Sequence, residues 1–263
     1  MAQSTVNTTN LARLISDHRD DPAVQVSQLV VNVPLTGHSF ISQDFIFKLR
    51  DHLLTRLHGY KYDGDELCFS DAEHNNLELE NLNRIPEPKR LRVAYTTYDI
   101  RHDQDSMSPG NGCAVMTLSR EDTAGAHPFW YARVLRIFRI PVRHVGPNSK
   151  DQSPHTMDIL WVRWLGIEPD YHWGFKEARL PKVGFIPDTD ENAFGFLDPS
   201  LVIRGCHLIP AFTEGRTTTL MKPGPSLGRL SRETDDWSSF YVNIYMVLLS
   251  NSLSQRFVPL QIC

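Results

Sequence analysis

The first clear pattern in the chain is a helical repeat of apolar residues that begins after Ser42. Apolar side chains recur at spacings of three and four residues, at Phe45, Ile46, Leu49, Leu53, Leu54 and Leu57. Gly59 follows at a position where glycine commonly ends a helix. The repeat predicts one N-terminal amphipathic helix over residues 41–59.

From residue 91 onward the pattern changes to short β-branched and aromatic runs separated by Pro, Gly and Asp. We expect strands at residues 91–100, 113–119, 130–143, 157–165 and 201–212. The run at 130–143 alternates, with mostly apolar residues at even positions and Tyr131, Arg133, Arg139 and Arg143 at odd positions. The spacing of the strands, with long loops between them, predicts a mainly β (α+β) fold with a β-rich domain over 91–213. A small, partly open β-barrel or a sandwich fits this pattern better than repeated βαβ units.

The remaining segments show neither the helical repeat nor the strand alternation. Residues 1–40 are polar and are expected to be a mostly disordered tail. Residues 60–90 are acidic and rich in asparagine, and we interpret them as a linker. Residues 214–263 are expected to be an irregular C-terminal segment, with marginal order after about residue 250 because Pro259 disfavours a helix there.

Charge is distributed unevenly around a total of -4. Residues 129–144 contain no acid, and they carry Arg133, Arg136, Arg139 and Arg143, with Arg163 nearby. A basic strand face of this kind can bind an acidic protein or follow a phosphate backbone. It can equally form ion pairs with the chain's own acidic segment at 63–80, and the sequence leaves these alternatives open.

Aromatic residues are concentrated around the same strands. The group consists of Trp130, Tyr131, Trp161, Trp164, Trp173 and Phe175. Such residues most often form the core of a small β domain, and a stacking platform or aromatic cage is the functional alternative. Trp173 is the best candidate for exposure because it lies in a loop, and Tyr131 is a second candidate for stacking.

No pattern in the sequence indicates catalysis, and we predict neither a cofactor nor a metal site. The four cysteines lie far apart, the eleven histidines form no metal-ligand motif, and the acidic run at 63–73 lacks the order of a calcium loop. The glycines at 224 and 228 are not followed by a phosphate-loop Lys, so we interpret them as part of a flexible surface loop. Convergence of Asp99, Asp158 and Asp198 on a metal is the one enzyme hypothesis left open.

Compartment is predicted from what the sequence lacks. It has no secretory signal at its start and no apolar run of about 18 residues, the length that a membrane span needs. We therefore expect an intracellular protein, nuclear or cytoplasmic, without a membrane partner. The sequence does not indicate an oligomeric state.

Several long motifs carry a family resemblance. They are HPFWYARV at 127–134, LWVRW at 160–164, RLPKVGF at 179–185, AFGFLDP at 193–199 and IRGCHLIPAF at 203–212, with LRDHLL at 49–54, YDGDE at 62–66 and YTTYD at 95–99 upstream. Together they resemble the C-terminal accessory region of uncharacterised mushroom-type (basidiomycete) fungal proteins associated with transposases of the Kyakuja-Dileera-Zisupton and Plavaka kind. The DDW at 235–237 and YVN at 241–243 are similar to the family's ending, whereas residues 246–263 replace its usual glycine-rich tail.

The resemblance implies a non-catalytic accessory or interaction module of a transposon-derived nuclear protein, whose nuclease carboxylates would lie outside this sequence. Its strand layout is also similar to that of chromatin-reading bromo-adjacent-homology (BAH) and Tudor-like barrels. We therefore expect the module to bind an acidic protein partner or chromatin through Arg133, Arg139 and Arg143. The alternatives are a DNA- or RNA-binding module that adds Tyr131 or Trp173 for stacking, and a degenerate fragment without present activity.

Overall fold

The computed structural model describes residues 43–60, 67–79, 86–96, 102–121, 126–147, 149, 151–174, 177–243 and 261–262. The predicted tail at 1–40 lies outside these residues. The chain forms two compact units. The smaller unit contains the described residues up to 60, those between 66 and 85, and 141–156. The larger unit contains 86–140 and the described residues from 157 onward.

The predicted helix is confirmed in the smaller unit as α3 (Gln43–His58). Leu49, Leu53 and Leu54 are buried, as the repeat predicts, and Gly59 follows the helix with a φ of 77°. The helix also buries polar residues that the repeat does not mark, among them Asp51 and His52. Burial on more than one side shows that α3 is an integral part of its unit.

The prediction of a structureless linker at 60–90 is wrong for residues 71–79. Helix α4 (Asp71–Asn75) begins with a capping box, in which the Ser70 hydroxyl accepts from the Glu73 backbone and the Glu73 carboxylate accepts from the Ser70 backbone. Strand β1 (Leu77–Leu79) then pairs antiparallel with β5 (Phe129–His144), with Leu77 opposite His144. Some acidic residues of this segment lie in the first turn of α4, where a negative charge is favourable.

The larger unit is mainly β, as predicted, and its helices in the described residues are short 3₁₀ turns. Its strands are β2 (Leu91–Thr96), β3 (His102–Met107), β4 (Ala114–Leu118), most of β5, most of β6 (His155–Ile167), β7 (Lys182–Phe185), β8 (Phe194–Leu197), β9 (Val202–Pro210), β10 (Arg216–Thr217), β11 (Asp236–Trp237), β12 (Phe240–Asn243) and β13 (Gln261–Ile262). The turns are η2 (Pro109–Asn111), η3 (Pro199–Leu201) and η4 (Phe212–Glu214).

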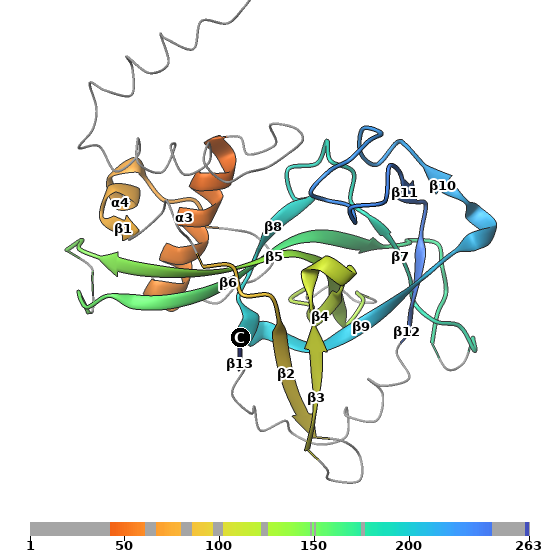
Figure 1. Cartoon of the computed structure of the whole chain (residues 1–263), viewed down its shortest axis with the longest axis horizontal. Coiled ribbons are helices and arrows are strands. Elements are labelled where there is room, and N and C mark those ends of the chain that lie inside the picture. The colour runs from red at the N-terminus through yellow and green to blue at the C-terminus, as the bar shows by residue number, and fades with distance from the viewer. Residues whose placement is uncertain are drawn as a thin grey trace, which may run out of the picture. The chain divides into compact units, whose positions relative to one another are not determined.

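The main sheet has the strand order β1-β5-β4-β9-β12-β7-β6-β8, and β5 also pairs with β6. Strand β12 pairs antiparallel with both β9 and β7, so that Phe240 lies opposite Pro210 on one side and Val183 on the other (Figure 1). The prediction of an irregular segment after residue 213 is therefore wrong for β10, β11 and β12. Residues 244–260, which include most of the expected marginal tail, lie outside the described part.

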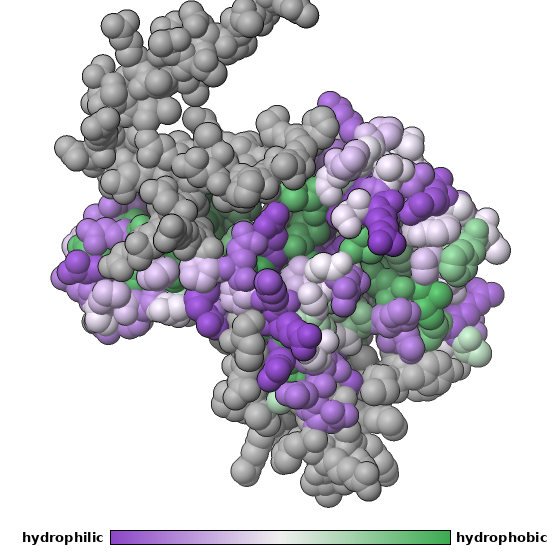
Figure 2. Space-filling view, in the orientation of Figure 1, coloured by the Kyte–Doolittle hydropathy of each residue, from purple (hydrophilic) through white to green (hydrophobic). Residues whose placement is uncertain are grey.

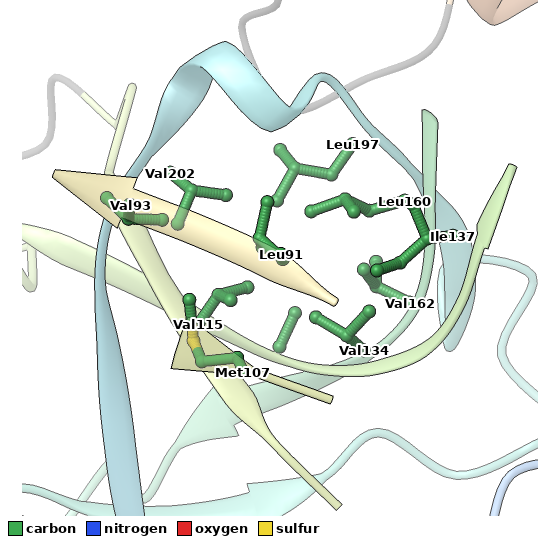
Figure 3. Close-up of a cluster of buried hydrophobic side chains, with 11 residues drawn as sticks. Leu91, Val93, Met107, Val115, Val134, Ile137, Leu160, Val162, Leu197 and Val202 are labelled. Carbon is green, nitrogen blue, oxygen red and sulfur yellow. The ribbon is translucent and has the colours of Figure 1, made fainter. Parts of the chain in front are cut away.

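The larger unit buries side chains on both faces of its strands. One cluster contains Leu91, Val115, Val134, Leu160 and Val202, with further apolar neighbours (Figure 3). The second cluster is formed by Met116, Phe129, Tyr131, Leu165, Val183, Phe185, Phe240 and Val242. Strand β4 contributes Val115 to the first cluster and Met116 to the second, as the alternation of side chains along a strand requires.

Strands β2 and β3 form a ribbon beside β9, in a small sheet of order β13-β2-β3 (Figure 1). The Asp105 carboxylate accepts hydrogen bonds from Arg204 Nε and from the Gly205 backbone, both at 2.9 Å. A side chain at Gly205 would place its Cβ 2.6 Å from Met107 Sδ. Glycine at this position therefore allows the ribbon to approach β9 closely.

Candidate interaction site

The predicted basic face of β5 is largely neutralised by carboxylates of the same chain. Arg139 forms a two-point contact with Asp158, at 2.8 and 3.1 Å. Arg143 lies 3.6 Å from Glu78 and donates to the backbone oxygen of Gln152. Glu78 belongs to the acidic segment at 63–80, so the alternative of internal pairing is confirmed for Arg143. Both arginines are partly exposed, and contact of either with a partner stays a prediction.

Arg133 does not lie on an open face. Its exposure is 6%, its guanidinium lies 4.6 Å from the Phe185 ring centroid, and its Nη1 is 3.4 Å from the Glu233 carboxylate. Burial lowers the pKa of Arg133, and the nearby Glu233 charge opposes this effect. The interpretation of Arg133, Arg139 and Arg143 as one accessible basic stripe is therefore wrong.

A neighbouring set of charges is buried completely. The Asp236 carboxylate accepts paired hydrogen bonds from Arg163 at 2.9 and 3.1 Å, and from Arg229 at 3.2 and 3.0 Å. Arg229 also donates to the backbone oxygens of residues 221, 222 and 224. Residues 222, 223 and 225 are exposed, so the loop around Gly224 lies at the surface as expected, and a buried arginine binds its backbone. Its flexibility stays a prediction.

The two stacking candidates, Tyr131 and Trp173, both contact the ring of His127. The His127 ring centroid lies 4.4 Å from that of Trp173 and 5.5 Å from that of Tyr131. Tyr131 is fully buried, so it is a core residue that cannot stack on a partner at the surface. Trp173 is half-buried and packs against the second apolar cluster. His127 was not singled out as a site residue in the sequence.

A second aromatic group lies at the surface around β12. The Tyr171 and Tyr241 ring centroids are 6.1 Å apart, with the Arg179 guanidinium 5.8 Å and Lys182 Nζ 5.6 Å from the Tyr171 ring. Lys182 forms an ion pair with Glu214 of η4. Their hydrogen bond raises the pKa of Lys182 and lowers that of Glu214, which strengthens the pair.

The same turn carries the most exposed large apolar side chain of the described residues. Phe212 is 69% exposed, and its ring meets Trp237 edge-on at 5.2 Å. The Arg216 guanidinium lies 4.9 Å from the Trp237 ring and pairs with Asp235 at 3.0 Å. Hydrophobic residues reach the surface near the end of β9 that leads into η4 (Figure 2).

These contacts connect into one surface, which we call the aromatic face: Tyr171, Arg179, Lys182, Phe212, Arg216, Trp237 and Tyr241. Lys182 and Glu214 join its two halves. The sequence does not predict this face, because Trp237 and Tyr241 fall in the segment expected to be irregular. The available signal was the pair of motifs DDW and YVN, which stand out only through the family resemblance.

Reactive and metal-binding groups are not assembled in the described part of the chain. Burial raises the pKa of the Cys113 thiol to about 12 and raises that of Cys206 further, which disfavours a thiolate nucleophile in either case. Asp158 is engaged with Arg139, Asp198 caps η3, and Asp99 lies outside the described residues. Within the described residues, no group of three or more His, Cys, Asp or Glu side chains has the arrangement of a metal site.

The comparisons with known proteins add no relative. No protein-family model matches the chain, and neither the curated proteins nor the solved structures contain a match. Within the residues described, no helix combines the length and the apolar character needed to cross a bilayer.

Proposed function

We propose that the larger unit is a non-catalytic module that binds a segment of a protein partner on its aromatic face. The observation that carries this proposal is the exposure of Phe212, at 69%, beside Trp237 and Arg216. Phe, Trp, Tyr and Arg are the residue types enriched at protein interfaces, and a few of them usually dominate the binding energy.

The charges of the face favour a protein partner over nucleic acid. Lys182 and Arg216 already pair with Glu214 and Asp235, so most of the positive charge is compensated on the face itself. A sequence-independent nucleic-acid site needs uncompensated Lys and Arg along the backbone path. The arginines of β5 offer little support for that alternative, because Arg133 is buried and Arg139 pairs with Asp158.

The finer fold and the biological setting belong to the same proposal. Side chains of the second cluster come from β4, β5, β6, β7 and β12, with partly buried residues of β9, and pairing continues from β6 back to β5. These observations support a partly open barrel, for which the BAH- or Tudor-like layout stays a prediction. A nuclear, transposon-derived context, with an acidic or chromatin partner, rests on the sequence resemblance alone.

Selection of peptides from a random displayed library on the full chain tests the proposal. Peptides that bind the aromatic face should lose about tenfold or more in affinity in Phe212→Ala and in Trp237→Ala, the effect expected of central interface residues. Leu118→Ala is the matched control, because Leu118 is another exposed apolar side chain of the larger unit, at 46%.

Two results would contradict the proposal. One is that every selected peptide keeps its affinity in both face variants while those variants unfold at the temperature of the wild type. The other is that the chain binds a single-stranded oligonucleotide with an affinity that falls steeply with salt and is lost in Arg139→Ala with Arg143→Ala. The second result would instead establish the nucleic-acid alternative.

A further inference from the structure

The contact of His127 with Trp173 and Tyr131 contains buried polar atoms that lack hydrogen-bond partners. Two polar atoms within it, His127 Nε2 and Tyr131 Oη, are buried and have no hydrogen-bond partner among the described residues. Burying an unpaired hydrogen-bonding group destabilises a fold, so native structures contain few of them. Two such atoms on adjacent aromatic rings, with centroids 5.5 Å apart, call for a common explanation.

The other side of the His127 ring contacts the backbone of Phe129. Nδ1 lies 2.8 Å from the Phe129 backbone oxygen and 3.1 Å from the Phe129 backbone nitrogen. Nδ1 can donate to this carbonyl, which leaves Nε2 as an acceptor, or it can accept from the Phe129 backbone N–H, which leaves Nε2 as a donor. Burial lowers the pKa of His127, so the ring is neutral near pH 7. The Tyr131 hydroxyl supplies a donor.

Trp173 is the third aromatic residue of this contact, and it is half-buried. This side chain lies on the His127 ring and belongs to the connection between β6 and β7. The connection is closed by a backbone bridge between Gly174 and Arg179, and Gly174 has a φ of 112° with nothing within 4 Å of where a Cβ would lie.

We infer that His127, Tyr131 and Trp173 form a binding site for an uncharged group that both donates and accepts a hydrogen bond. A side-chain amide or hydroxyl both donates and accepts, as the Tyr131 hydroxyl does, so it can pair with His127 Nε2 and Tyr131 Oη in either tautomer. A cation fits less well, because neither atom is charged and desolvation of an ammonium group is costly. The site rests on the proposed interaction role for its biological guest, an Asn, Gln, Ser or Thr side chain of the partner.

A small probe tests the site without a partner protein. We expect acetamide, added to the full chain labelled in its histidine and tryptophan side chains, to shift the NMR signals of His127 and Trp173 in a saturable manner. Tyr131→Phe, which keeps the ring and removes the hydroxyl, should abolish the shifts. Tyr60→Phe is the matched control, because Tyr60 is an exposed tyrosine of the smaller unit, and it should leave the shifts unchanged.

Thermal unfolding of Tyr131→Phe provides a second readout. The melting temperature should stay the same or rise, because the variant removes a buried hydroxyl that has no partner in the free protein. A fall of about 3 °C or more, roughly the effect of 1 kcal/mol in a chain of this size, would show that the hydroxyl is already paired and would overturn the inference.

Three further outcomes would also overturn it: no shift with acetamide, equal shifts in Tyr131→Phe, or tetramethylammonium acting as strongly as acetamide. The last result would assign the rings to a cation cage instead. Phe212→Ala should leave the acetamide shifts unchanged. Failure of this site and failure of the aromatic face therefore give different results.

Discussion

Among single residues, Asp236 has the largest predicted effect on stability. Its carboxylate is almost completely buried and pairs with both Arg163 and Arg229, whose side chains are 0% exposed. Burial raises the pKa of Asp236, but the hydrogen bonds and charges of the two arginines together lower it below its ordinary value. Asp236→Ala leaves two buried guanidinium groups without their counter-ion, so we expect the free energy of unfolding in urea to fall by about 3–5 kcal/mol.

Asp158→Ala is the control for that measurement. Asp158 also receives a two-point contact from an arginine, Arg139, but both side chains of this pair are partly exposed. Exposed ion pairs contribute about 0–1 kcal/mol, so this variant should unfold close to the wild type. Equal losses in the two variants would contradict the view that burial, and not the arginine contact itself, makes Asp236 important.

Strand β5 shows which residue environments could be predicted from the sequence and which could not. The alternation of β5 correctly placed Ala132 and Val134 on a buried face, because side chains on a strand have a period of two. It did not reveal that the opposite face, with Tyr131 and Arg133, is buried as well. Tyr131 packs in the second apolar cluster with side chains from β6, β7 and β12, and Arg133 pairs with Glu233, which lies 100 residues further along the chain. No local pattern identifies such distant partners.

At the scale of elements, the end of α3 and the end of β5 are joined by a histidine pair. The His58 and His144 ring centroids lie 5.3 Å apart, and both ring nitrogens of His58 are buried without a partner among the described residues. Burial, followed by the charge of His58, lowers the pKa of His144 below its ordinary value of 6.5, and Glu73 opposes the shift. The contact therefore favours a neutral His144.

The sign of the pH dependence follows from this shift. Below pH 6.5 the unfolded state binds a proton at position 144 that the folded state disfavours, so stability falls as pH falls through this value. We expect hydrogen exchange of α3 and β1, corrected for its intrinsic pH dependence, to be several-fold faster at about pH 5.5 than at about pH 7.5.

His144→Gln should remove most of that acceleration. His155→Gln is the control, because His155 is exposed and lies in a loose pair with Asp151. If the two variants respond to pH in the same way, the histidine pair is not the source of the effect.

Long helices and strands can be predicted from the sequence more reliably than short ones. The helix at 43–58 was predicted because it is long enough to show a repeat, whereas α4 has five residues and β1 has three. Strand β12 is only four residues long, and it lies in the sheet because its neighbours β9 and β7 offer two open edges. Short elements of this kind are specified by distant partners and not by their own period.

At the scale of the whole molecule, the sheet order changes the boundary of the β-rich domain. The sequence placed its end at residue 213, but β12 at residues 240–243 lies between β9 and β7 and contributes Phe240 and Val242 to the second apolar cluster. Asp236, which neutralises Arg163, also lies beyond the expected boundary. A domain cut at 213 is therefore missing a central strand and a buried counter-ion.

Two truncations of the chain test this boundary. A chain ending at residue 243 keeps β12 and loses β13, which pairs with only two residues of β2, so it should melt cooperatively within a few degrees of the full chain. A chain ending at residue 215 leaves the facing edges of β9 and β7 unpaired and Arg163 buried without Asp236, so it should show no cooperative transition by circular dichroism. Cooperative melting of the shorter chain at the temperature of the longer one would mean that the β-rich unit does not need β12, and that the expected end at 213 was correct.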